Sequence, residues 1–346
     1  MNPPNEVNAI SLREKIARTR EMLDRACPVF ILVDPLLGEP RTPHLITGDG
    51  ANAEAIRRAR WDRPIEPITL PTSISLPRDQ HPYLVALHGI DDPLIDFSVE
   101  LALDEHARSV AHGLDGNGGA AHRIGGWLQS AHSASQLAGD LAAMCKLDTD
   151  AVTSARYLRM VDRRTLAFLV HTVGTDRVAS SCGALSRWCY LDMHGKPAKL
   201  DNTGVTTSRL HITRQEWQFL KQGEEIHRTL AKWVGEQGHS DAVRESLDSK
   251  QLYRAAANAL EKARQLGARF PRRFQSMADL TTWAALSLAY PQIDKSSNVL
   301  TSLADTGSPD QPASSLHNIH RELLDIYSAE RDTESFEVLQ SFGARQ

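Results

Sequence analysis

The sequence predicts an α/β fold: a mixed sheet with flanking helices, followed by an all-α C-terminal lobe. Two observations predict it. Short apolar segments rich in β-branched residues alternate with helical patterns as far as about residue 202. Beyond Thr203 the apolar residues recur only at helical spacing. We therefore expect an α/β domain over residues 1–205, with its core at about 28–202, and a helical domain over 206–346.

The first elements follow from these patterns. Residues 10–26 are expected to form a helix, and "CPVFILVDP" is expected to be a buried strand that ends at Asp34. A second helix is expected at 50–60. The segment 63–82 contains five prolines, which cannot donate to a sheet ladder, so it is a loop or an edge strand. "PYLVALHG" is the second strand, and a helix from Asp92 to Gly113 follows it.

The glycine-rich stretch "LDGNGGAAHRIGGW", at 114–127, raises the question of a phosphate-binding loop. Such a loop follows a strand, opens a helix and is usually succeeded by Lys-Ser/Thr. Here a helix precedes the glycines, and "HRIGGWLQS" after them has the pattern of a strand. We therefore interpret the stretch as a helix-to-strand connector.

The remaining elements complete the two domains. Ser133 and Asp162 are each expected to cap a helix, and "RYLRMVD" to be the strand before Asp162. A short helix at 176–185 and the hairpin "SRWCYLDMHGKPAKLD" close the sheet domain. The helical domain is expected to contain helices at 213–235, at 240–266, from Met277 to Pro291 and, after the linker "DTGSPDQPASS", from about 315.

Composition narrows the classes of function. The net charge of −4 provides no overall basic field for nucleic acid or an anionic membrane. No apolar run reaches the length of a membrane span, and the polar N-terminus lacks the pattern of a signal peptide. The four cysteines are scattered and form no CxxC motif. We expect a cytoplasmic protein whose partners include neither nucleic acid nor a membrane.

Few residues have the arrangement of a catalytic site. Asp34, Asp162 and Asp192 end strands and could hold a metal or act as acid and base, but aspartates there also cap helices and start turns. His317 and His320 could share a metal, although no further ligand motif accompanies them, and GxSxG is absent. We expect a protein that is not an enzyme, with no catalytic residue, cofactor or metal. A metal-dependent hydrolase that uses the strand-end aspartates remains an alternative.

A basic cluster offers a second alternative. It comprises Lys262, Arg264, Arg269, Arg272 and Arg273, with Phe270 and Phe274 between them. Such a cluster could contact RNA, but a solvated helix end is the simpler interpretation because the domain as a whole is not basic.

Five segments together resemble a known family. They are "VFILVDPLLGEP", "HPYLVALHG", "GGWLQSAHSASQLAGDLAAMCKL", "RYLRMVDRRTLAFLV", with its Arg-x-x-Asp-x-Arg-x-Leu pattern, and "RWCYLDMHGKP". In this order they resemble the effector adaptor-chaperones of bacterial type VI secretion (Tap or TEC type, with a DUF-class adaptor domain). "ITRQEWQFL" is similar to the helical half of the family's long members. The chain departs from the family at Pro35 and in its longer loops at 63–82 and 113–122.

The resemblance implies a function in protein binding. Members of the family bind a toxic effector and load it onto a VgrG-type spike protein, so these two proteins are the expected partners. The expected partner-binding residues are Trp127, Arg159, Asp162, Arg163, Trp188 and Tyr190. The three aromatic residues could equally belong to the core, because aromatic side chains in strands are usually buried. In a regular strand, Arg159 would face away from Asp162.

Overall fold

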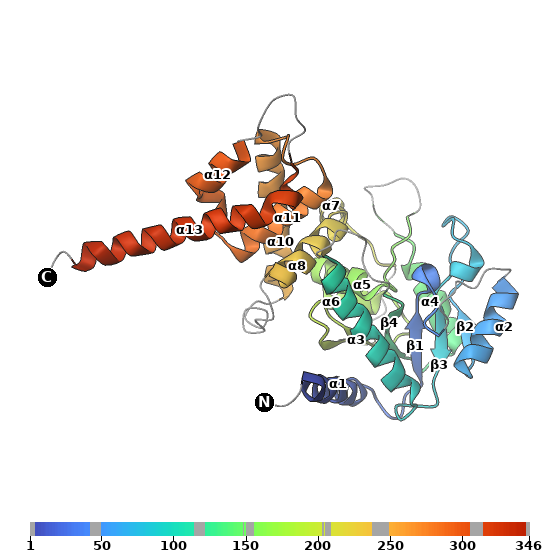
Figure 1. The fold of residues 1–346 in the computed structure, drawn as a ribbon. Helices are drawn as coiled ribbons and strands as arrows, with labels where there is room; N and C mark the ends of the chain where they lie inside the picture. Colours follow the sequence, from blue (N-terminus) through green and yellow to red (C-terminus); the bar gives the residue numbers. More distant parts are fainter. Residues whose placement is uncertain are drawn as a thin grey trace. The chain divides into compact units, whose positions relative to one another are not determined.

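The structure is a computed structural model that describes residues 4–41, 50–113, 122–147, 149, 156–202, 204, 209–236, 249–304 and 314–343 (Figure 1). The chain divides into two compact units. The first comprises Met1–Ser109 and Gly119–Gly223, and the second comprises Val110–Gly118 and Glu224–Gln346. The predicted fold class is confirmed: a sheet with flanking helices precedes a helical region. In the described part of the chain, no helix is long and apolar enough to cross a membrane.

Six strands form one sheet in the first unit. They are β1 (Val29–Val33), β2 (Ile65–Pro67), β3 (Tyr83–Ala86), β4 (Ile124–Gln129), β5 (Arg187–Leu191) and β6 (Pro197–Asp201), in the order β2-β3-β1-β4-β5-β6. Every pairing between them is antiparallel, where the alternation of strands and helices predicted a mixed sheet. The sheet is antiparallel because the connection from β1 to β2 passes over β3, and the connection from β3 to β4 passes over β1. β1 and β2 run the same way with β3 between them, and β3 and β4 run the same way with β1 between them.

Alternate residues of the strands face two separate cores. In β1, Val29, Ile31 and Val33 belong to one core, and Phe30 and Leu32 belong to the other. The first core also takes side chains from α1 (Pro4–Glu21), α2 (Gly50–Trp61) and α3 (Leu94–Gly113). The second takes side chains from α4 (Ala134–Met144), α5 (Arg163–Val173) and α6 (Thr175–Ser180). Helices therefore cover both faces of the sheet.

The segment 156–162 corrects one sequence prediction, because it is not a strand. Its pairing is limited to an isolated bridge between Tyr157 and Lys146. The chain then turns, and the N–H of Asp162 donates to the carbonyl of Arg159 at 3.0 Å. The apolar residues of "RYLRMVD" are buried as a strand would bury them, so their pattern alone could not reveal the turn.

The boundary between the two units lies later than predicted. Residues 213–235 form two helices, α7 (Arg214–Leu220) and α8 (Gly223–Glu236), rather than one. A Cβ atom on Gly223 would lie 3.2 Å from the ring of Phe168, so glycine permits this close approach at the break. Phe219 of α7 also packs against Phe168, with ring centroids 5.0 Å apart. These contacts keep α7 with the sheet, so the division falls after Gly223 and not after residue 205.

The second unit contains α8, α10 (Ser249–Arg269), α11 (Met277–Ala289), α12 (Ser297–Ala304) and α13 (Leu316–Gly343). The predicted helices from Met277 and from about 315 are confirmed as α11 and α13. α10 continues two residues past Gly267, and α12 was not predicted. Most of the predicted linker, and Gly116, Gly118 and Gly119, lie outside the described residues.

Candidate functional site

Three residues that the sequence singled out, Asp34, Arg159 and Asp162, meet at the end of β1. Together with Arg164 they form a group that we call the strand-end cluster. Asp34 follows β1 and accepts the N–H of Leu36 at 3.0 Å, which caps a short 3-10 turn. Nε of Arg159 donates to Oδ2 of Asp34 at 2.6 Å. The same guanidinium lies 3.7 Å from Oδ2 of Asp162. Arg159 therefore joins two aspartates that are far apart in sequence: Asp34 after β1 and Asp162 at the start of α5.

Asp162 caps α5, as predicted. Oδ1 accepts the N–H of Arg164 at 3.0 Å, and Oδ2 accepts from the Arg164 side chain at 2.7 Å. The turn before Asp162 also brings it to the same side as Arg159, which corrects the expectation of opposite faces. Asp162 is 3% exposed, so the carboxylate is shielded from water, whereas the side chains of Arg164 and Arg159 remain partly exposed.

The electrostatics of the cluster suit ion pairing. Burial would raise the pKa of Asp162, but the charge and hydrogen bonds of Arg164 outweigh it and hold the pKa well below its usual range. Burial raises the pKa of Asp34 above its ordinary value, and the Arg159 charge opposes that rise. Both carboxylates are thus engaged by guanidinium and backbone N–H groups, which is the arrangement of a structural ion-pair network.

Arg163 lies beside this cluster but points into a separate buried network. Its guanidinium lies 3.3 Å from a carboxylate oxygen of Glu105 and donates to the carbonyl of Ile124 at 3.3 Å. Arg123 donates to the same carboxylate at 2.8 Å. Because both Arg163 and Glu105 are buried, this network ties α3, β4 and α5 together.

The three predicted aromatic residues are core residues, which was the alternative that the sequence left open. Nε1 of Trp127 donates to Oγ of Ser98 at 2.8 Å, and Nε1 of Trp188 donates to the carbonyl of Gly125 at 3.2 Å. Tyr190 is 6% exposed, and burial raises the pKa of its phenol to about 12. None of the three side chains presents a large exposed face.

Gly125 and Gly126 have a role that sequence reasoning missed. A Cβ on Gly125 would lie 2.4 Å from the carbonyl oxygen of Val161 and 3.0 Å from Leu32. A Cβ on Gly126, where φ is +141°, would lie 2.7 Å from Nε1 of Trp188. Two glycines inside a strand pattern are the signal that could have indicated such a close approach.

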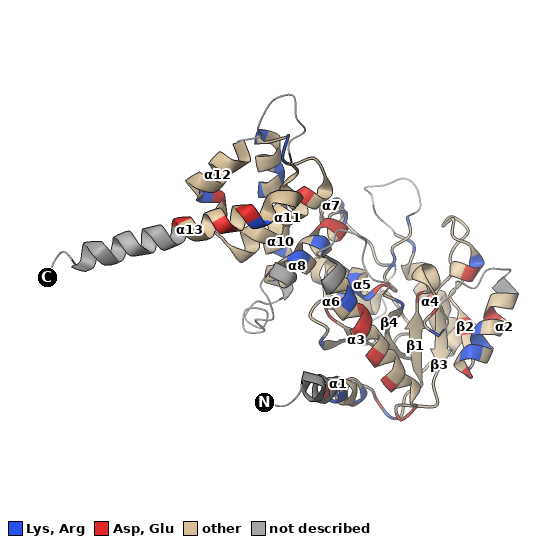
Figure 2. Ribbon diagram, viewed as in Figure 1, with Lys and Arg blue, Asp and Glu red and all other residues tan. Residues whose placement is uncertain are grey.

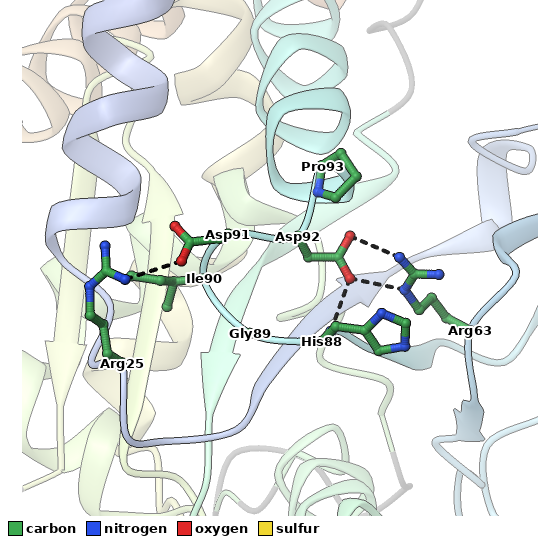
Figure 3. Close-up of a pocket in the computed structure, with 8 residues that line it drawn as sticks. All are labelled: Arg25, Arg63, His88, Gly89, Ile90, Asp91, Asp92 and Pro93. Atoms are coloured by element: carbon green, nitrogen blue, oxygen red, sulfur yellow. Dashed lines mark hydrogen bonds and ion pairs between the residues drawn. The ribbon is translucent and has the colours of Figure 1, made fainter.

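An open hollow of about 410 Å³ lies at the opposite end of the sheet from Asp34, where β3 leads into α3 (Figure 3). We call it the β3–α3 hollow; its lining residues are Arg25, Arg63, His88, Gly89, Ile90, Asp91, Asp92 and Pro93. This hollow could not be predicted from local sequence pattern, because Arg25 and Arg63 come from separate segments.

Two ion pairs of different character line the β3–α3 hollow. Asp92 accepts from Nε of Arg63 at 2.9 Å and from the N–H of His88 at 2.9 Å, so it holds the loop together. Burial opposes ionisation of Asp92, but the hydrogen bond from Arg63 and those from the backbone lower its pKa. Arg25 and Asp91, by contrast, lie 3.1 Å apart with both side chains 75% exposed. The hollow therefore offers exposed charge of both signs, and the acidic residue, Asp91, lies on the loop that Asp92 holds.

The remaining candidates are engaged in local contacts. Asp192 accepts from the N–H groups of His194 and Lys196, at 2.8 and 2.9 Å, and forms the hairpin turn. The rings of His317 and His320 stack at 5.8 Å, and Nδ1 of His320 lies 2.7 Å from the carbonyl of His317. Within the described residues, no group of three or more His, Cys, Asp or Glu could hold a metal ion.

In the basic cluster of the second unit, several cations are paired. Arg264 contacts Glu225, and Lys262 lies 3.3 Å from Asp294. Arg273 is 9% exposed and donates to the carbonyl of Ser314 at 2.9 Å. These contacts are those of helix packing and of a solvated helix end.

Comparisons of the chain with protein-family models, with curated proteins and with solved structures give no match.

Proposed function

We propose that this protein is an effector adaptor of a type VI secretion system, which binds a toxic effector and loads it onto a VgrG-type spike protein. The proposal starts from the five ordered segments that resemble this family. Under this proposal, the sheet domain recognises the effector, and the helical region supports the sheet domain or contacts the spike.

One observation carries the proposal: four of the five segments meet at Gly125 and Gly126. Leu32 belongs to the first segment, Val161 to the fourth and Trp188 to the fifth, and all three lie against these glycines of the third. The second segment contains β3, which pairs with β1 of the first. Segments that are inherited together as one domain are expected to pack against one another, so this packing agrees with the resemblance on which the proposal rests.

The β3–α3 hollow is the surface that we assign to effector contact. Its Arg25–Asp91 pair is exposed, and Asp91 stands on a loop that the buried Asp92 fixes. A fixed loop loses little conformational entropy on binding, and exposed charges of both signs provide orientation. A stable complex needs about 800 Å² from each partner, so the contact must extend beyond the hollow.

Co-expression with a secreted toxin encoded beside this protein tests the adaptor function. We expect the two proteins to co-elute at fixed stoichiometry in pull-down and size-exclusion experiments, and the toxin to lose solubility without the adaptor. An effector that is soluble, secreted and active in a strain that lacks this protein would contradict the proposal.

A matched pair of variants tests the assigned surface separately. Asp91→Lys places a positive charge beside Arg25 and should weaken effector binding at least tenfold. Asp104→Lys is the control, because Asp104 is also exposed and paired with an arginine, Arg108, at 2.8 Å, but lies outside the hollow. Equal affinities for the two variants would exclude the hollow while leaving the adaptor function standing.

A further inference from the structure

The two edges of the sheet differ in the backbone groups that they present. β2 forms one edge and β6 forms the other. Next to β2, the N–H of Ile68 donates to the carbonyl of Pro82 at 2.8 Å, so the alternate residues Ile65 and Pro67 turn their backbone groups away from β3. Proline has no N–H, and β2 is only three residues long. This edge is therefore poorly suited to pairing with another strand.

The edge at β6 keeps its backbone donors. The N–H of Asn202 donates to the carbonyl of Ser186 at 3.0 Å, which fixes the phase of the hydrogen bonds between β6 and β5. Residues that bond to the neighbouring strand alternate with residues whose N–H and C=O point the other way. Lys199 and Asp201 therefore direct both groups out of the sheet. In the described part of the chain, neither of these two N–H groups has an acceptor.

The side chains of β6 hold the strand in place and leave charge at its edge. Leu200 is 1% exposed and belongs to one core of the sheet. Lys199 and Asp201 lie on the opposite face, with side chains that are 45% and 41% exposed, and Nζ of Lys199 is 2.7 Å from Oδ2 of Asp201. Arg187 of β5 also pairs with Asp201. The edge is thus a fixed strand that carries opposite charges two positions apart.

This order of charges is complementary to itself in an antiparallel pair. When Lys199 lies opposite Asp201 of a second β6, Asp201 necessarily lies opposite Lys199 of that strand. Every outward N–H of these residues then meets a carbonyl of the other copy. Placing Lys199 opposite Lys199 would also align the backbone groups, but like charges directly opposite each other are unfavourable. The charges therefore favour one register.

We propose that β6 is an interface for a second copy of this chain, which pairs antiparallel with Lys199 opposite Asp201 and joins the two sheets into one. Basic and acidic residues are interspersed over both units (Figure 2), and the net charge is −4, so long-range repulsion between copies is small. A stable interface needs about 800 Å² from each partner, which a strand of five residues does not supply. The dimer is therefore transient and depends on concentration.

Sedimentation velocity of the full-length protein at increasing concentration tests the pairing, and we expect a reversible monomer–dimer equilibrium. Lys199→Pro removes an outward N–H from each copy and leaves the hydrogen bonds to β5 intact. Lys199→Ala is the matched control, because it loses the same side chain but keeps the N–H. The proline variant should dimerise at least about tenfold more weakly than the alanine variant.

An exchange of charges tests the register. Lys199→Asp puts two aspartates opposite each other and should weaken the dimer at least about threefold. Mixing this variant with Asp201→Lys should restore dimerisation, because opposite charges then face each other again. Lys146→Asp is the control: Lys146 is also an exposed lysine, but it lies outside β6, so this change should have no effect. Circular dichroism checks that each variant is folded.

Hydrogen exchange locates the interface, since the amides of Lys199 and Asp201 should exchange more slowly as the dimer forms. A protein that is monomeric at every concentration would overturn the proposal, as would equal dissociation constants for the proline and alanine variants. A mixture that does not dimerise better than its two components would overturn the register. The experiments contain no effector, so their failure would leave the adaptor function untouched.

Discussion

Replacing Asp162 separates the two roles that this buried carboxylate has in the strand-end cluster. Asp162→Asn keeps an oxygen to accept the N–H of Arg164 but removes the charge, whereas Asp162→Ala removes both the cap and the charge. An N-cap contributes about 0.5–2 kcal/mol. The comparison of the two variants therefore measures the cap alone.

The magnitude of the charge effect follows from the exposure of the partners. Breaking a fully buried pair costs about 3–5 kcal/mol, and an exposed pair contributes about 0–1 kcal/mol. Asp162 is buried, but the side chains of Arg164 and Arg159 are 29% and 20% exposed, so water partly replaces the lost carboxylate. We expect Asp162→Asn to lower the free energy of unfolding by about 1–2 kcal/mol and Asp162→Ala by about 2–4 kcal/mol.

Urea unfolding followed by circular dichroism, with hydrogen exchange of the α5 amides as a local probe, measures both variants. The loss in Asp162→Asn should shrink below about pH 4, because the lowered pKa of Asp162 stabilises the folded state only where the unfolded chain is ionised. Equal losses in the two variants would refute the capping argument. Stabilities that both match the unsubstituted protein would refute the whole account of the cluster.

Two further predictions concern glycine and histidine. Gly126→Ala should destabilise the protein by more than about 2 kcal/mol, because the added Cβ would lie 2.4 Å from the carbonyl oxygen of Cys189. The control is Gly139→Ala, on the open surface of α4, which should be neutral or slightly stabilising in the same urea assay. Burial lowers the pKa values of His81 and His122 in the folded state, so the unfolded chain takes up protons first and the free energy of unfolding should fall between pH 7 and pH 5. His81→Gln should reduce the fall in the free energy of unfolding between pH 7 and pH 5. If the fall is the same in this variant, His81 does not contribute to it.

The fold class and most helix positions could be predicted from local pattern. The capping roles of Ser133 and Asp162 are confirmed, because a cap depends on residues within one turn. The edge position of β2 is confirmed as well, since proline excludes a central strand. The turn at 160–161 was missed, because a buried turn and a buried strand have the same apolar composition.

The candidate sites, by contrast, are formed by residues that are far apart in the sequence. Arg159 could be singled out as a candidate, but its pairing with Asp34 joins residues that are 125 positions apart. The β3–α3 hollow likewise brings together side chains from separate elements. No local pattern encodes these meetings.

The sequence by itself therefore determined most of the helices and strands and the capping residues Ser133 and Asp162, since these depend on neighbours within a few positions. Only the tertiary structure decided the strand order, the antiparallel pairing and the interlocking of the resembling segments at Gly125 and Gly126. The physical reason is that an antiparallel sheet and a mixed sheet bury the same alternating pattern of apolar residues along each strand. Which of the two sheets forms depends on which strands the whole chain can place next to each other while helices cover both faces of the sheet.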